Sequence, residues 1–186
     1  MVISVIGETD VRPFIYTLMK ICQGLGDVLV VTNDRRYMRF IEYEGERSDE
    51  FVSGHFQNTT IIITDGTPDE AQVAVGYDSD DYEFIIYVNK LDADSDLMLY
   101  VQGMEMSEWE EEVLEYLEEG TDYQTIHFGF GKNKIPMTSK MFMNCEIMES
   151  KKVLIQIDPN VTKVLCGIMS KELNIPANTL AKAVAK

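Results

Sequence analysis

The stretch MVISVIGETDVRPFIYTLMKICQGLGDVLVVTND, residues 1–34, decides the fold class of this chain. Val2 to Ile6 is a continuous apolar, β-branched run, which is typical of a strand buried on both faces. Asp10 can cap a helix from about Val11 to Leu25, and VLVVT at 28–32 follows as a second buried strand. A strand, a helix and a strand in this order predict a βαβ unit with two parallel strands.

The rest of the chain continues this alternation. Further buried strands are predicted at Thr60–Thr64, Phe84–Val88, Leu97–Val101, Thr125–Phe128 and Val153–Ile157. Helices are predicted at Ser107–Glu119, at Val161–Leu173 and from Asn178 onward. Between Arg35 and Asn58 the pattern is mixed, since MRFIEYE favours a strand and GERSDE favours a loop.

These elements predict an α/β fold with a mainly parallel central sheet flanked by helices. The 186 residues suit a single α/β domain over 1–186. Its last part, about 160–186, is expected to be a helical segment with a basic tail.

Charge is high and unevenly distributed. The chain carries a net charge of −16, with −20 on residues 1–150 and +4 on residues 151–186. So acidic a protein repels a phosphate backbone, which disfavours direct nucleic-acid binding. Partners are therefore expected to be proteins, with a homo-oligomer as one open form.

The cysteines and the apolar runs indicate where the protein works. Cys22, Cys145 and Cys166 lie far apart without metal-ligand spacing, which is typical of free thiols in a reducing cytoplasm. Apolar runs such as MVISVI and FIIYV are far shorter than a membrane span. A cytoplasmic protein without a membrane span or a signal peptide is expected.

The loop after the first strand is the first place to look for a ligand, because open parallel sheets bind ligands beyond the carboxyl ends of their strands. A P-loop needs several glycines, a lysine and a Ser or Thr hydroxyl. GETDVRPFIYT keeps only Gly7 of the glycines and has no lysine. Glu8 and Asp10 stand where phosphates would sit, and Pro13 removes one helix N–H. No ATP hydrolysis and no catalytic residues are predicted.

Several segments together resemble the MinD/ParA-like branch of P-loop ATPases. They are GLG at the end of the first helix, DVLVVTND, DYEFIIYV and VLIQIDPNVTKVL. The glycine-lysine loop of that family is absent, and Asn89 stands where its second metal-site aspartate is expected. The resemblance implies a pseudo-ATPase of MinD/ParA-like topology, and such members act as localisers or scaffolds for larger machines.

A second segment leaves nucleotide binding open. YVNKLD, residues 87–92, follows a buried strand and matches the NKxD element of small GTPases. If ATP or GTP with Mg²⁺ binds, the expected cofactor-binding residues are Gly7, Thr9, Arg12, Asn89, Lys90 and Asp92. A turn that ends the strand is the favoured interpretation, and no cofactor and no dedicated metal site are expected.

NDRRYMRF gathers Arg35, Arg36 and Arg39 in an otherwise acidic region. They are the predicted interaction residues, for an anion, a phosphorylated partner or a carboxylate of another copy. Pairing with the chain's own acids is the alternative. The sequence thus favours a non-catalytic scaffold or regulatory protein in a partitioning, secretion or phage assembly, with a nucleotide-binding switch as the alternative function.

Overall fold

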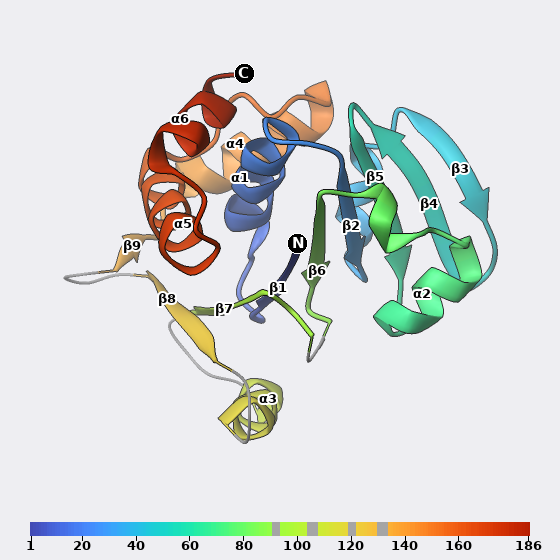
Figure 1. Cartoon of the computed structure of the whole chain (residues 1–186), viewed down its shortest axis with the longest axis horizontal. Helices are drawn as coiled ribbons and strands as arrows, with labels where there is room; N and C mark the ends of the chain where they lie inside the picture. Colours follow the sequence, from blue (N-terminus) through green and yellow to red (C-terminus); the bar gives the residue numbers. More distant parts are fainter. Residues whose placement is uncertain (91–93, 104–107, 119–121, 130–133) are drawn as a thin grey trace.

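The computed structural model describes residues 1–90, 94–103, 108–118, 122–129 and 134–186. Its strands form a nine-stranded sheet in the order β3-β4-β5-β2-β6-β1-β7-β8-β9. β4 runs antiparallel to its two neighbours, and all other pairs of neighbouring strands are parallel. The predicted α/β fold with a mainly parallel central sheet flanked by helices is confirmed (Figure 1).

The element bounds are as follows. The strands are β1 Val2–Ile6, β2 Val28–Thr32, β3 Tyr43–Arg47, β4 Phe51–Phe56, β5 Thr59–Thr64, β6 Phe84–Val88, β7 Leu97–Gln102, β8 Tyr123–Gly129 and β9 Ile135–Pro136. The helices are α1 Arg12–Gln23, α2 Pro68–Val75, α3 Glu108–Glu118, α4 Ser139–Lys151, α5 Pro159–Glu172 and α6 Ala177–Ala185, with 3-10 turns η1 Arg35–Arg39 and η2 Ser79–Asp81.

The two faces of the sheet are covered by different helices. The main core cluster joins one face to α1, α4, α5 and α6, which gather on one side of the sheet in Figure 1. Two smaller clusters join the other face to α2 and to α3. Because strand side chains alternate between faces, continuous apolar strands such as VLVVT serve both cores.

The first βαβ unit forms as predicted, with one addition. β1 and β2 are parallel, and β6 lies between them and pairs with both. The helix cap differs from the prediction, because Val11 occupies the N-cap position and makes no side-chain cap. Asp10 still contributes, since the backbone N–H of Arg12 donates to its Oδ1 at 3.2 Å.

The predicted strand at Val153–Ile157 is wrong. These residues form an irregular connection between α4 and α5 on the helical side. Leu154 packs into the main core, whereas the side chain of Ile155 is 67% exposed. The apolar run thus resembles a strand locally but has no neighbouring strand to pair with.

The mixed region between Arg35 and Asn58 is also more structured than predicted. MRFIEYE begins in η1 instead of a strand, and β3 starts only at Tyr43. GERSDE contributes to β3 as well as to the turn before β4, so it is not a simple loop. The helix predicted at Ser107–Glu119 is present as α3, although both of its predicted end residues lie outside the described residues.

The helices α2 and α4 were not predicted. A local signal for α2 exists, because Thr67 and Glu70 form a reciprocal capping box and Pro68 begins the helix. For α4 the amphipathic pattern is weak, and Thr138 caps it by accepting from Met141 N. No helix in the described ranges has the length and apolar character needed to cross a membrane.

Candidate functional site

Four parallel strands bring their carboxyl ends to one edge of the sheet. β5, β2, β6 and β1 are neighbours in that order, so the loops after Ile6, Thr32, Thr64 and Val88 lie along the same edge. On its other side β1 pairs with β7. The helix after β1, α1, covers one face of the sheet, and the helix after β7, α3, covers the opposite face. Open α/β sheets bind ligands at such a point, where helices diverge to opposite faces.

The loop after β1 is joined to its surroundings by both of its first N–H groups. Gly7 N donates to Asn89 Oδ1 at 3.0 Å, and Glu8 N donates to Glu110 Oε1 of α3 at 2.9 Å. A Cβ on Gly7 would lie 2.6 Å from Val101 O, so only glycine fits against β7. The two N–H groups that begin this loop are therefore bonded within the chain.

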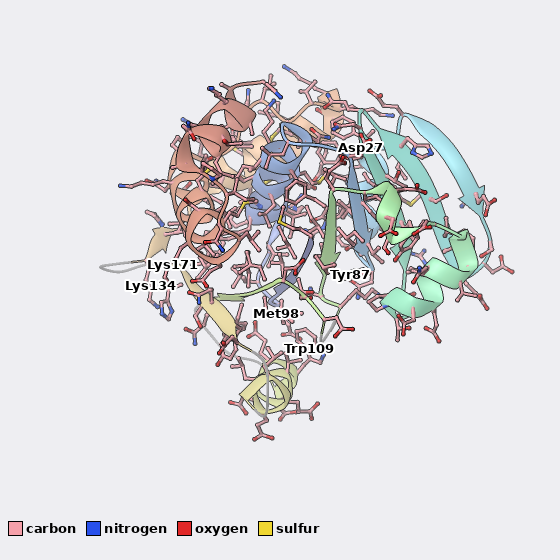
Figure 2. The ribbon with its side chains drawn as sticks, viewed as in Figure 1. Asp27, Tyr87, Met98, Trp109, Lys134 and Lys171 are labelled. Carbon is pink, nitrogen blue, oxygen red and sulfur yellow. The ribbon has the colours of Figure 1, made fainter. Side chains whose placement is uncertain are left out.

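Glu110 is a carboxylate that sequence reasoning did not assign to any functional site. It lies on α3 and is only 1% exposed. Burial, together with the negative charge of Glu110, raises the pKa of nearby Tyr100 to about 12. Trp109 of α3 packs against the core cluster that contains Met98 of β7 (Figure 2). The backbone N–H of Glu8 thus already has a side-chain acceptor within the chain.

Arg12 belongs to a network of charged side chains at the start of α1. Its Nε donates to Asp10 Oδ1 at 2.9 Å, and its Nη2 lies 2.6 Å from Asp10 Oδ2. Its Nη1 donates to Glu149 Oε1 of α4 at 2.8 Å. The Arg12 side chain is 8% exposed and that of Glu149 is 0% exposed. The predicted cofactor-binding guanidinium is therefore occupied by two carboxylates of the chain.

Two of the three predicted interaction arginines belong to the same network. Arg39 Nη1 donates to Glu149 Oε2 at 2.7 Å. Arg36 pairs with Asp34 at 2.6 Å and with Asp10 at 3.2 Å. We call these six residues the arginine–carboxylate cluster: Asp10, Arg12, Asp34, Arg36, Arg39 and Glu149. Three positive and three negative groups leave the cluster neutral.

The cluster shifts the ionisation of its members. Burial acts to raise the pKa of Asp10, but the hydrogen bonds and charge of Arg12 and the charge of Arg36 outweigh it and lower this pKa below 3.8. The hydrogen bond to Asp10 and that to Glu149 raise the pKa of Arg12 in spite of burial. Burial chiefly raises the pKa of Tyr16, whose hydroxyl donates to Glu149 Oε1 at 2.7 Å. The shifts of Asp10 and Arg12 favour the charged forms that make the ion pairs, and the raised pKa of Tyr16 keeps its hydroxyl protonated as a donor to Glu149.

Lys90 connects the ends of two strands. Its Nζ donates to Thr64 O at 2.8 Å and also to Gly66 O, beyond β5. The side chain is buried, and this burial lowers the pKa of Lys90 although Asp65 and Glu70 oppose the change. The preceding Asn89 has a left-handed φ of 52° and accepts from Gly7 N. The first residues of the NKxD segment therefore form a turn that ends β6, as predicted. Asp92 lies outside the described residues.

The structure thus separates the predicted cofactor-binding residues into several environments. Gly7 N donates a hydrogen bond to the side chain of Asn89. Thr9 lies against Gly103, since a Cβ added to Gly103 would be 3.1 Å from the Cβ of Thr9. Arg12 belongs to the arginine–carboxylate cluster, and Lys90 bonds to the carbonyls beyond β5. Each described member has a structural contact within the chain.

A groove at the same edge of the sheet was missed by sequence reasoning. It has a volume of about 960 Å³ and lies between the β3–β4 turn, the ends of β2 and β5, and α2. Arg35, the third predicted interaction residue, is exposed and lines this groove. Its other lining residues include Met38, Arg47, Asp49, Glu50, Phe51, Val52, Asp65, Asp69, Glu70 and Val73. No local motif marks it, because its walls come from separate segments.

A second groove lies at the opposite end of the sheet. It has a volume of about 500 Å³ and is lined by residues of β8, β9 and α5. Lys134 and Lys171 lie near each other on it (Figure 2), and Lys171 pairs with Glu172 at 2.6 Å. Within the described ranges no three His, Cys, Asp or Glu side chains gather closely enough to hold a metal ion.

Several solved structures are similar in fold to this chain. The chain is similar to the structure of the MinD cell division protein of Aquifex aeolicus, at 14% sequence identity and a TM-score of 0.44. The match covers 99% of this chain and 95% of that chain. No family model matches the sequence, and no curated protein is similar to it. A likeness of this degree says nothing about activity.

Proposed function

We propose that this protein is a non-catalytic scaffold or regulatory protein that acts through protein contacts in a larger cytoplasmic assembly, such as a partitioning, secretion or phage system. It is a pseudo-ATPase in this proposal. One observation carries it: the N–H groups of Gly7 and Glu8 are both bonded to side chains of the chain itself. These are groups that a phosphate-binding loop would direct at its ligand.

The charges around the loop support the same proposal. A nucleotide phosphate at Glu8 N would displace the buried carboxylate of Glu110 and would meet the carboxylates of Glu8 and Asp10. Arg12 cannot neutralise that phosphate without leaving Asp10 and Glu149, and Glu149 is fully buried. In this proposal the described residues of the loop provide no cradle for ATP or GTP with Mg²⁺.

Calorimetry tests this proposal against the nucleotide-binding switch. ATP and GTP are titrated with Mg²⁺ into protein at concentrations well above micromolar. We expect no binding heat at millimolar nucleotide, whereas a dissociation constant in the micromolar range would overturn the proposal.

A pair of variants shows whether Glu110 is the obstacle to an otherwise competent site. Glu110→Gln removes the buried charge beside Glu8 N, and Glu111→Gln removes an exposed charge from the neighbouring position. The proposal expects neither variant to bind nucleotide, since Arg12 stays paired and Glu8 and Asp10 stay acidic. Micromolar nucleotide binding by Glu110→Gln alone would show a masked nucleotide site and contradict the scaffold function.

A further inference from the structure

The groove of about 960 Å³ displays apolar side chains that the core does not use. Val73 on α2 is 85% exposed, and Met38 in η1 is 36% exposed. They are two of the five exposed large apolar side chains in the described chain. Half-buried Phe51 and Val52 add further apolar surface from β4. Apolar surface rimmed by polar residues marks a protein interaction site.

The charged residues of this groove are mostly acidic. Its lining contains five carboxylates: Asp49, Glu50, Asp65, Asp69 and Glu70. Arg35 and Arg47 are its only cations among the lining residues, so the lining carries a net charge of −3. The carboxylates come from the β3–β4 turn, from the loop after β5 and from the start of α2. Negative charge therefore flanks the apolar surface on more than one wall.

We propose that this groove binds a segment of a partner protein in which lysine or arginine residues flank apolar side chains. The inference rests on the proposed function, because it names the partner chemistry of a protein that acts through contacts. Apolar side chains of the segment pack against Val73 and Met38, and its cations lie near the carboxylates. The net charge of −16 attracts such a segment from a distance.

The same charges argue against other occupants. A second copy of this chain carries the same net charge of −16, so long-range repulsion opposes its approach. A phosphorylated or acidic segment meets a lining of net charge −3. A cationic segment without apolar residues leaves Val73 and Met38 in water. The combination of charge and apolar surface is therefore what selects the partner.

Two probe peptides separate this site from general attraction to an acidic protein. One contains lysine and leucine, and the other has the same length and number of lysines with serine in place of leucine. Each is labelled with fluorescein and titrated with the full chain at physiological ionic strength, and anisotropy is measured. We expect the lysine–leucine peptide to bind about tenfold more tightly, because only it can bury apolar surface.

Variants locate the binding. Met38→Ser with Val73→Ser removes the exposed apolar side chains of the groove. Met143→Ser with Ile155→Ser removes two exposed apolar side chains elsewhere, which are 59% and 67% exposed. Asp49→Asn with Glu50→Gln removes two charges from the groove, and Glu111→Gln with Glu112→Gln removes two exposed charges from α3. We expect each groove pair to weaken lysine–leucine binding about tenfold and each control pair to weaken it less than twofold.

Two kinds of result would overturn the inference, diffuse attraction and absence of binding. Equal loss in the groove and control pairs would show diffuse attraction, as would equal affinity for the two peptides. If neither peptide binds, the proposed binding of a cationic, apolar segment in this acidic groove is also refuted. Neither result changes the nucleotide titrations, so failure of this inference is distinguishable from failure of the proposed function.

Discussion

Glu149 is the residue on which the arginine–carboxylate cluster depends most. Its buried carboxylate accepts hydrogen bonds from Arg12, Tyr16 and Arg39, and so connects α4 to α1 and η1. A buried ion pair gives little net stability compared with apolar packing, but removing one partner leaves the other charge uncompensated. The cluster is therefore sensitive to single substitutions although its net charge is zero.

Replacing Glu149 tests this dependence. We expect Glu149→Ala to lower the free energy of unfolding by about 3 kcal/mol, because Arg12 and the Tyr16 hydroxyl lose a buried acceptor. Urea denaturation followed by circular dichroism measures the change. Glu146→Ala, at an exposed position of the same helix, is the control and should change stability by less than about 0.5 kcal/mol. Equal effects of the two variants would refute the role of Glu149.

Asp10 gives the cluster a defined dependence on pH. Its pKa is lower in the folded protein than the ordinary 3.8, so the native state favours the charged carboxylate. This contribution to stability is present above pH 3.8 and is lost as the pH falls through the folded pKa. We expect Asp10→Asn to be less stable than the natural chain at pH 7 and the difference to shrink below pH 3.8.

Urea titrations at a series of pH values between neutral and strongly acidic measure this difference. Asp27→Asn is the control, because Asp27 is exposed in the turn before β2. A stability difference between Asp10→Asn and the natural chain that stays constant over the whole range would contradict the linkage.

At the scale of elements, side-chain caps fix where helices begin. Asp158 caps α5, since its Oδ1 accepts from Asn160 N at 2.8 Å and from Val161 N at 3.2 Å. Pro159 begins the helix. The cap sets the start of a helix whose Val161, Leu165 and Met169 enter the main core.

Removing this cap should affect the whole fold. We expect Asp158→Ala to lower the free energy of unfolding by about 1 kcal/mol, because two helix N–H groups lose their acceptor. Asp158→Ser keeps an acceptor oxygen and should stay close to the natural chain. Thermal and urea unfolding measure both variants, and equal destabilisation by alanine and serine would refute the capping role.

Glycine positions show how closely the elements approach one another. A Cβ on Gly24 would lie 2.3 Å from Ala183 O and 2.6 Å from Ala183 Cα, so α1 and α6 meet there backbone to backbone. Leu180 and Ala183 of α6 are buried, and α6 contacts both α1 and α5. The predicted basic tail is therefore part of the helical layer in the structure.

Gly24→Ala tests this close contact. Gly24 has a helical backbone, so the added methyl acts through steric overlap and should cost about 1 to 3 kcal/mol of stability. Hydrogen exchange should increase first in the amides of α6. Gly167→Ala is the matched control, because a Cβ there has no neighbour within 4 Å and alanine favours the helix. Protection of α6 in Gly24→Ala equal to that of the natural chain would contradict the contact.

At the scale of the whole molecule, the sequence predicted the central strands of the sheet better than the edge strands. β1, β2, β6 and β7 lie within one residue of their predicted bounds, because each is a continuous apolar run in the centre of a parallel sheet. β3 and β4 form an antiparallel edge of mixed residues, where the pattern of apolar residues favours no single element. Val153–Ile157 was wrongly assigned because a local run cannot show whether a partner strand exists.

The candidate site also has features that the sequence determined and features that only the tertiary structure decided. The sequence by itself determined the α/β class, the acidic balance and the lack of a glycine-lysine loop after β1, because these follow from composition and local spacing. Only the tertiary structure decided that Arg12 pairs with Glu149, which is 137 residues away, and that Glu110 bonds to the loop at Glu8. The groove of Met38 and Val73 is likewise a product of folding, since separate segments form its walls. The periodic spacing of apolar residues is a local property of the sequence, because it needs only a few neighbouring residues. The partner of a buried charge depends on how elements distant in the sequence pack together.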